Sequence, residues 1–430
     1  MRLVNLAFSR IPYPTSHIPN LSGFCGLRGY IFTFAMTKED FTVPGFKAGA
    51  IAAGIRYQGR PDLALITSEV PATAAGVFTT NKVQAAPVLL SRSHLIGNTA
   101  RAIVVNSGIA NACTGDIGLQ RAQATARIAA DAIGCPLEEI LVASTGVIGM
   151  DLPIEPVANY LPKLVPLVRS DGWMDAAQAI MTTDTVPKIR MVRSRLQDRP
   201  FTVLGIAKGA GMICPDMATL LSFVATDAAI TPEALQTLVR EEAERSFNRI
   251  TVDGDTSTND TLIVLANGGA ANQPIADLAS PDGERLRQAL GGVLLDLAKK
   301  IVADGEGATK FVEIRLKGAS SQAEALRGAR TVANSPLVKT ALFGEDANWG
   351  RVLAALGRAD IRFDPNQVQL FFNEVKLVDN GLSLGEEAEN KASEILRQPS
   401  FSITIDLGEG TAEESVYTCD LSIDYIKINA

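Results

Sequence analysis

Short apolar runs alternate with segments of helical periodicity from about residue 44 to the end of the chain, and this alternation constrains the fold most. Runs of roughly four to eight apolar residues between turn residues predict buried strands. Such runs occupy 51–57, 63–69, 102–108, 140–146, 311–318, 368–373, 401–408 and 416–428. Helical spacing predicts helices over 118–134, 154–168, 232–246 and 284–302. Strands interleaved with helices favour a layered α/β fold over a helical bundle.

Composition removes several classes of protein. With 430 residues, 47% of them apolar and 20% charged, the chain is globular and long enough for two or three domains. The sequence contains no run of about eighteen apolar residues, so no membrane span is predicted. The net charge of −7, with scattered basic residues, argues against a nucleic-acid groove. Five cysteines, never spaced as CxxC, make a disulfide framework or zinc site unexpected and favour a reducing compartment.

Histidine is scarce. The chain has only His17 and His94, and His94 falls in a polar segment that reads as a loop. A Ser-His-Asp hydrolase or a two-histidine metal site would need more imidazoles than this. If the chain is an enzyme, its base is therefore expected to be a group other than histidine.

The first 38 residues differ in composition from the rest. They contain no Asp or Glu, yet they hold three arginines, a lysine and several prolines and serines. That composition resembles a transit segment. The favoured alternative is an extended or mis-called start, with Met36 as the true first residue. The stretch is excluded from the fold argument in either case.

Three glycine- or aspartate-rich segments invite familiar interpretations that their spacing does not support. GIAKGAGM (205–212) and DGEGATK (304–310) lack the glycine pattern of a dinucleotide site and the Gly-Lys-Ser/Thr ending of a P-loop. DGDTSTND (253–260) resembles a calcium loop, but Thr258 and Val264 occupy its two diagnostic positions. Its Asp and Asn side chains instead predict a hydrogen-bonded turn beside a site.

Seven motifs together resemble one known family. They are STGVIG (144–149), MTTDTVPK (181–188), KGAGM…MATL (208–220), ITVDGDTSTND (250–260), DGEGATK (304–310), NSPLVKTA (334–341) and FGEDANWGR (343–351). In this order they are similar to the ornithine acetyltransferases, also called the arginine-biosynthesis bifunctional glutamate N-acetyltransferases. The resemblance covers essentially everything from about residue 40 to the end.

This resemblance implies a precursor that cleaves itself between Ala218 and Thr219. The hydroxyl of Thr219 would attack the preceding carbonyl, and water would resolve the ester. The implied products are an α chain (36–218) and a β chain (219–430), with 1–35 as an N-terminal extension. The freed amine of Thr219, whose ordinary pKa is near ~8, would then be the local base, so that no histidine is needed. Without the family, Thr219 reads as a buried strand residue.

The resemblance also implies the roles of other residues. Thr145 and Gly146, at the turn after the strand that begins at 140, would form the oxyanion hole. The implied substrate-binding residues are Thr185 (with Thr183 less favoured), Lys208, Thr219, Glu306 and Asn429. Lys208 suits a substrate carboxylate and Glu306 an ammonium group. Outside this family both charges would read as solvated surface groups.

The chain departs from the family pattern in two places. Cys-Pro-Asp (214–216) stands where His-Pro-Asn or a similar run is common, which concerns the rate of cleavage. Family members also usually continue a few residues past Ile-Asn-Ala and end in a Thr or Ser that contacts substrate. This sequence stops at Ala430, so that residue is not assigned.

The hypothesis is a cytoplasmic, self-cleaving acetyltransferase of arginine biosynthesis. Acetyl would pass from N2-acetyl-L-ornithine to Thr219 and then to L-glutamate, with acetyl-CoA an additional donor in some members. The family has an α/β/β/α fold and an α2β2 heterotetramer, and it implies no metal or bound cofactor. An organelle is the alternative location if 1–35 is a transit segment. The rivals are an N-terminal-nucleophile aminopeptidase or amidohydrolase of related fold, and a non-catalytic amino-acid-binding protein.

Overall fold

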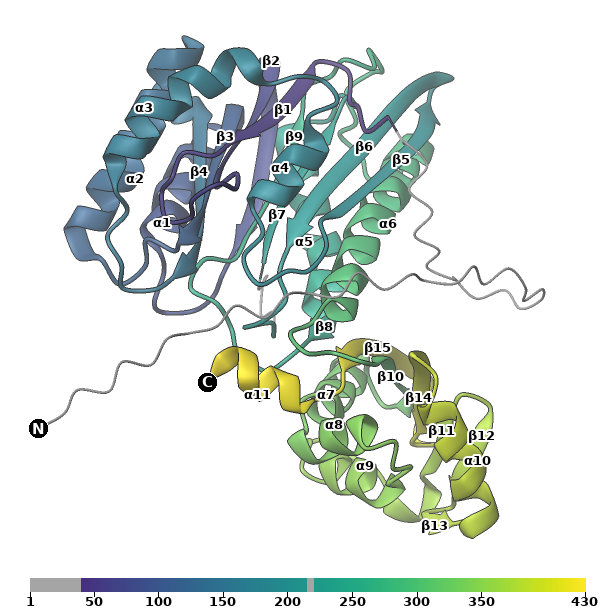
Figure 1. Cartoon of the computed structure of the whole chain (residues 1–430). Coiled ribbons are helices and arrows are strands. Elements are labelled where there is room, and N and C mark those ends of the chain that lie inside the picture. The colour runs from purple at the N-terminus through teal and green to yellow at the C-terminus, as the bar shows by residue number, and fades with distance from the viewer. Residues whose placement is uncertain (1–39, 215–219) are drawn as a thin grey trace, which may run out of the picture. The chain divides into compact units, whose positions relative to one another are not determined.

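Two β-sheets and their covering helices make up the computed structural model, which describes residues 40–214 and 220–430 (Figure 1). The first sheet has eight strands in the order β4-β3-β2-β9-β7-β6-β5, with β1 paired to β2. Its strands are β1 (Phe46–Ile51), β2 (Leu63–Phe78), β3 (Thr99–Ile109), β4 (Ile140–Val147), β5 (Lys188–Leu196), β6 (Arg199–Lys208), β7 (Leu221–Thr226) and β9 (Thr261–Ala266). This mixed α/β architecture confirms the predicted fold class.

Helices cover both faces of this sheet, as alternate residues of β2 show. Leu63 and Leu65 pack into a cluster with helices α2 (Gly115–Ile133) and α3 (Ile154–Leu164). Ala64 and Ile66, which point the other way, join a cluster with Trp173 of α4 (Trp173–Ala179). A strand buried on both faces reads as a continuous apolar run. This is why the strands were visible in the sequence.

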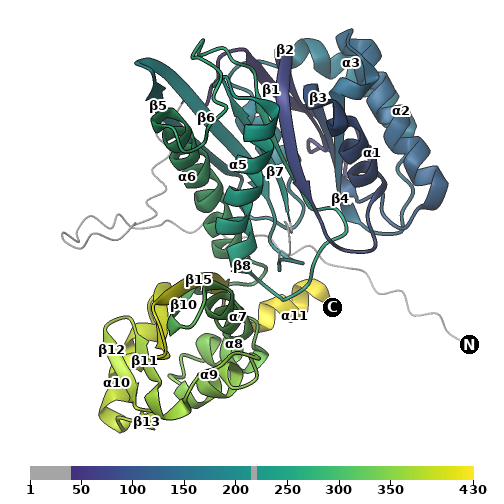
Figure 2. The same cartoon turned by 180° about the vertical axis from the view of Figure 1, so that it is seen from behind.

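The remaining helices of this part are α1 (Ala86–His94), α5 (Pro232–Arg245) and α6 (Pro281–Ala303). Figure 2 shows α5 and α6 side by side across the sheet, where they share a core with Val203 and Val224. Thr231 and Ser280 cap these two helices by accepting hydrogen bonds from their first turns, and a proline follows each cap. Gly134, directly after the last residue of α2, adopts φ 77°, the left-handed conformation that glycine often supplies at the end of a helix.

The second sheet has seven strands in the order β13-β12-β11-β14-β10-β15-β8. They are β8 (Ile250–Thr251), β10 (Phe311–Ala319), β11 (Gln369–Phe372), β12 (Val375–Asp379), β13 (Leu382–Ser383), β14 (Ser400–Asp406) and β15 (Ala412–Cys419). Its helices are α7 (Gln322–Ala333), α8 (Pro336–Phe343), α9 (Trp349–Leu356), α10 (Glu386–Leu396) and α11 (Ile423–Asn429). Residues of β10, β11 and β14 share a buried cluster with α7 to α10.

Two of the predicted strands are wrong in part. The strand predicted over 51–57 lies earlier, at Phe46–Ile51, where it pairs with β2. The strand predicted over 416–428 ends at Cys419, and α11 follows it. The Ser422 hydroxyl accepts hydrogen bonds from the backbone of Asp424 and Tyr425 and so begins a helix. An alternating apolar pattern of so few residues does not distinguish a strand from this helix.

Strand register brings together elements that carry motifs noted in the sequence. β6 and β7 are antiparallel, with Lys208 opposite Leu221, and β7 and β9 are parallel, with Leu221 opposite Thr261. The predicted cleavage bond, Ala218–Thr219, lies outside the described residues, as does the predicted extension 1–35. Strands from both sides of that bond nevertheless share the first sheet. In the described part of the chain, no helix is long and apolar enough to cross a membrane.

Candidate active site

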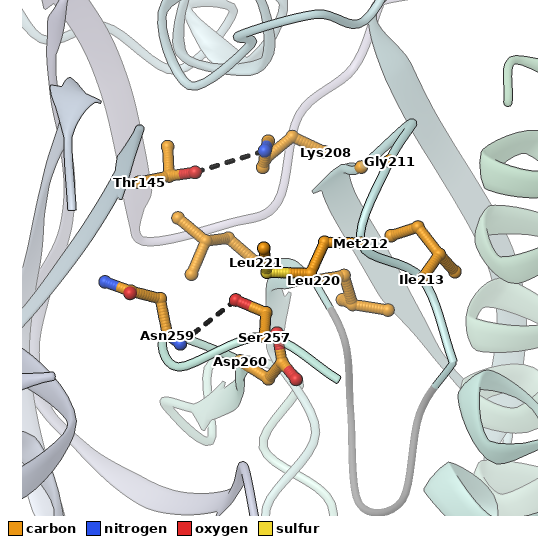
Figure 3. A pocket seen from close by; sticks show the side chains of 11 residues that line it. Thr145, Lys208, Gly211, Met212, Ile213, Leu220, Leu221, Ser257, Asn259 and Asp260 are labelled. Atoms are coloured by element: carbon orange, nitrogen blue, oxygen red, sulfur yellow. Dashed lines mark hydrogen bonds between the residues drawn. The ribbon is translucent and has the colours of Figure 1, made fainter. Parts of the chain in front are cut away.

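A cavity opens where β4, β6 and β7 approach the turn that precedes β9 (Figure 3). Lys208 and Thr145 lie on one side of it, and Ser257, Asn259 and Asp260 on the other. The full lining comprises Thr145, Lys208, Gly209, Gly211, Met212, Ile213, Leu220, Leu221, Ser257, Asn259 and Asp260. Three of the motifs found in the sequence therefore meet at one place.

Thr145 and Lys208 are in direct contact. Lys208 Nζ donates a hydrogen bond of 3.1 Å to Thr145 Oγ1, although 63 residues separate them. Burial lowers the pKa of Lys208, and the carboxylates of Asp184, Asp260 and Glu306 partly oppose that shift. Because Thr145 Oγ1 accepts from the ammonium group, its own proton remains available to donate elsewhere. The pair can thus present both a hydroxyl donor and a positive charge.

A buried network of charged side chains lies next to Lys208 and the end of β6. Lys188 Nζ lies 2.7 Å from Asp184 Oδ1 and 2.6 Å from Asp304 Oδ2, and the Lys188 and Asp184 side chains are fully buried. Asp184 Oδ1 also accepts from the backbone N–H of Gly209, at 2.7 Å. Burial by itself would raise the pKa of Asp184, but the charges of Lys208 and Lys188 and these hydrogen bonds hold that pKa at about 2. Asp184 is therefore an anion that fixes the end of β6.

Thr185 belongs to the same network rather than to the lining of the cavity. Its backbone N–H donates to Asp304 Oδ2 at 3.0 Å, and its hydroxyl donates to Asp304 Oδ1. Asp304 directly follows the last residue of α6. Thr185, which the sequence predicted to bind substrate, directly follows Asp184 in the chain and is held by Asp304. Thr183, the less favoured choice, is exposed.

Glu306 and Asn429, both predicted from the sequence as substrate-binding residues, contact each other. Asn429 Nδ2 donates to Glu306 Oε2 at 2.7 Å, although 123 residues separate them. The carboxylate of Glu306 also packs against Gly211, because a Cβ on that glycine would lie 2.4 Å from the carboxylate carbon. Glu306 is therefore next to the lining of the cavity. Asn429 reaches it from α11, the helix that the sequence had suggested was a strand.

The DGDTSTND segment is the hydrogen-bonded turn that was predicted. Asp253 accepts from the backbone N–H groups of Met212 at 2.6 Å and Ile213 at 2.9 Å. Burial raises the pKa of Asp253, and its backbone hydrogen bonds partly oppose this. Tyr425 donates its hydroxyl to the same carboxylate at 3.4 Å. The turn thereby fixes the loop that follows β6 and ties α11 to it.

Asn259 fixes the ends of β3 and β4. Its Nδ2 donates to the carbonyl of Ala110 at 2.6 Å and to that of Ser144 at 2.8 Å, and the residue is 6% exposed. Ser144 directly precedes Thr145. Asn259 therefore sets where the backbone of Thr145 and Gly146 lies.

Gly146 is required by its surroundings. It lies within β4 rather than in the turn that was predicted to follow, and its φ is 133°. A Cβ there would lie 2.1 Å from the carbonyl carbon of Gly108 in the neighbouring strand β3. The close approach of the two backbones leaves room only for glycine.

His94 is a structural residue. It ends α1 instead of lying in a polar loop, is 9% exposed, and its Nδ1 lies 2.7 Å from the carbonyl of Ile140. His94 therefore stabilises the contact between α1 and the start of β4. His17, Ala218 and Thr219 lie outside the described residues.

The ArgJ family model matches residues 47–430. The chain belongs to the ArgJ family. Arginine biosynthesis bifunctional protein ArgJ of Geobacter sulfurreducens is 51% identical over 388 residues, which are 90% of this chain and 98% of that protein. The protein of the same name from Desulfotalea psychrophila is also 51% identical, with the same coverage. The solved ornithine acetyltransferase of Mycobacterium tuberculosis, complexed with ornithine, is 38% identical and covers 42% of this chain and 95% of its own, with a TM-score of 0.37.

Several residues that position the candidate site of this ArgJ chain were not predicted from its sequence. They are Asp184, Lys188, Asn259, Asp260 and Asp304, all within or beside the motifs already noted. The spacing of Asp184 and Lys188 could have suggested an ion pair. Nothing local in the sequence indicates that Asp304 meets them, because 116 residues separate it from Lys188.

Proposed function

We propose that this ArgJ protein is a self-cleaving acetyltransferase of arginine biosynthesis that moves acetyl from N2-acetyl-L-ornithine to L-glutamate. One observation carries the proposal, beyond membership of the family. Lys208 and Thr145 are hydrogen-bonded at a cavity that is also lined by Leu220, the residue directly after Thr219. Thr219, the nucleophile that the family resemblance implies, is thus the residue immediately before one that lines the cavity.

Cleavage would proceed through Thr219. Its hydroxyl oxygen attacks the carbonyl carbon of Ala218, the peptide C–N bond breaks, and water hydrolyses the resulting ester. The products are an α chain that ends at Ala218 and a β chain that begins at Thr219. Because strands β1 to β6 precede this bond while β7 and β9 follow it, the two chains would remain joined by the hydrogen bonds of one sheet.

Transfer would then use Thr219 twice. The freed amine of Thr219 takes the proton of its own hydroxyl, which attacks the acetyl carbonyl of acetylornithine and releases ornithine. Glutamate accepts the acetyl group in the second half-reaction. Each step passes through a tetrahedral oxyanion, to which the Thr145 hydroxyl and the backbone at Gly146 would donate hydrogen bonds. Loss of one such donor costs about 3–4 kcal/mol of transition-state stabilisation.

Substrate binding is assigned to charged groups next to the cavity. Lys208 would pair with the carboxylate of the amino acid and Glu306 with an ammonium group. Asn429 orients the Glu306 carboxylate through its hydrogen bond to Oε2. Thr185, held by Asp304, is the remaining residue that would contact the substrate.

Finer points of the proposal follow from the family resemblance. They are an α2β2 heterotetramer, a cytoplasmic location and the use of acetyl-CoA as a second donor. A mixture of acetyl-CoA and glutamate, supplied without acetylornithine, would test the last of these through the appearance of N-acetylglutamate.

One experiment tests the core of the proposal. The purified wild-type protein should give two bands on a denaturing gel, with a β chain of 212 residues whose N-terminal sequence is Thr-Leu-Leu-Ser. Thr219→Ala should stay a single chain without transferase activity, because both the attacking hydroxyl and the later nucleophile are lost. A β chain that begins elsewhere would refute the mechanism. Release of ornithine at the same rate with and without glutamate would identify a hydrolase instead.

A further inference from the structure

A second cavity, outside the candidate active site, is lined by three arginines and is called the arginine cavity below. It has a volume of about 430 Å³ and lies between α7 and the segment that follows α9, two helices that pack together (Figure 2). Its lining comprises Ala323, Leu326, Arg327, Arg330, Thr331, Asn334 and Arg358. Within residues 40–214 and 220–430, no aspartate or glutamate belongs to this lining. The proposed transfer reaction uses none of these residues.

Helical spacing places two of these arginines on one face of α7. Arg327 and Arg330 are three residues apart, so their side chains leave the helix on the same side. Arg358 comes from the segment after α9, and its Nη2 lies 3.5 Å from the carbonyl of Thr331 on that face. Three guanidinium groups therefore converge on one cavity, although the chain as a whole has a net charge of −7.

The positive charge of the arginine cavity has little compensation from the protein. Arg327 lies 3.4 Å from Asp360, but the Asp360 side chain is 98% exposed, so this ion pair contributes little. Among the described residues, Arg330 and Arg358 have no acidic partner, and each donates to a backbone carbonyl instead. Each guanidinium therefore keeps N–H donors for a ligand. A concave surface lined by charges of one sign attracts ions of the opposite sign, so this cavity favours an anion.

The chemistry and the size of the arginine cavity indicate a ligand that carries phosphate. A guanidinium group can donate two parallel hydrogen bonds to one phosphate. A phosphate ester carries about −1.5 to −2 charge near pH 7, more than a single carboxylate, and so balances more than one arginine. The volume of about 430 Å³ falls in the range of small-molecule sites. It leaves room beside the phosphate for an organic group that contacts Ala323 and Leu326.

We propose that the arginine cavity binds a small molecule through its phosphate groups. Asn334 connects this cavity to the candidate active site, because its Nδ2 donates to Cys214 Sγ at 3.5 Å and its Oδ1 accepts from Thr251 Oγ1 at 2.6 Å. Cys214 follows Met212, which lines the active-site cavity, by two positions. A ligand that contacts Asn334 is thus one side chain away from the loop after β6. Coenzyme A, adenine nucleotides and free phosphate all present the required chemistry.

Isothermal titration calorimetry of the purified protein tests this site with coenzyme A, ADP and inorganic phosphate as probes. Arg327→Gln and Arg358→Gln each remove one guanidinium group from an exposed position, so neither should disturb folding. Each should weaken binding at least ~10-fold, as expected for the loss of a charge-assisted hydrogen bond. Arg397→Gln is the matched control, because Arg397 is an exposed arginine that pairs with Glu394 on α10. It should bind the probes as the wild type does.

The three probes separate the sources of phosphate. Binding of coenzyme A but not of ADP assigns the site to the additional phosphate on the ribose of coenzyme A, and equal binding of both assigns it to their shared diphosphate. Binding of inorganic phosphate with the same affinity assigns it to the free ion. The proposal is overturned if no probe binds, or if both Arg327→Gln and Arg358→Gln bind as tightly as the wild type. Ornithine release in the presence of glutamate should not change in either variant, so this test is independent of the proposed function.

Discussion

Replacing Lys188 by Met tests whether the buried ion network holds the site together. Lys188 Nζ lies within 2.7 Å of both Asp184 and Asp304, and none of the three side chains is more than 7% exposed. Met fills a similar volume but leaves two buried carboxylates without their shared cation. Removing one partner of a buried ion pair typically costs about 3–5 kcal/mol. That is a large share of the roughly 5–15 kcal/mol that keeps most proteins folded.

The pKa of Asp184 determines how the stability loss in Lys188→Met should change with pH. In the wild-type protein the pKa of Asp184 is lowered to about 2, so its contribution to stability is present above its ordinary pKa of ~3.9 and is lost as pH falls toward about 2. Without Lys188, burial becomes a stronger influence and the pKa of Asp184 rises. Protonation of Asp184 then removes part of the free-energy cost of burying its unpaired charge. The stability difference between variant and wild type should therefore narrow from about pH 7 to about pH 4.

Urea unfolding followed by tryptophan fluorescence measures both effects. Lys391→Met is the matched control, because Lys391 pairs with Glu387 at the same four-residue spacing but on the exposed surface. We expect the urea midpoint to fall clearly for Lys188→Met and hardly at all for Lys391→Met. Equal midpoints for Lys188→Met and wild type at pH 7 would refute the argument. So would a difference that widens on acidification.

Three further predictions concern the site. Gly146→Val should lower the single-turnover rate of Thr219 acetylation more than it lowers substrate affinity, because the valine side chain would collide with the backbone of Gly108. An acetylation rate equal to that of the wild type would contradict this prediction. His94→Gln should leave the pH profile of activity unchanged, because the imidazole contacts a backbone carbonyl in the core; a lost ionisation in folded, cleaved protein would make His94 the base. Asn259→Ala leaves the carbonyls of Ala110 and Ser144 without their donor, so it should reduce stability by about 1–3 kcal/mol for each carbonyl, seen as a lower melting temperature, and should also lower kcat. An unchanged melting temperature and kcat would contradict the role of Asn259 in holding β3 and β4.

Local patterns predicted most of the elements and failed where a pattern was short. Helices α5 and α6 were predicted within a few residues, because long amphipathic repeats have one favourable burial. The segment 416–428 was only partly right, since the Ser422 cap that turns it into a helix competes with an alternating pattern. Helices α7 to α10 were not predicted from the sequence. Each of them is short, and packing against the second sheet stabilises them.

The sequence by itself determined the α/β class and the family, and it predicted Thr145, Lys208, Glu306 and Asn429 as site residues. Residue types and short spacings carry that information, since they reflect local chemistry. Tertiary structure alone decided that Asp304 meets Lys188 across 116 residues and that Asp260 faces Lys208. Strand register and burial in the whole fold set those contacts and the pKa shifts that follow from them, and no local stretch of the sequence encodes either.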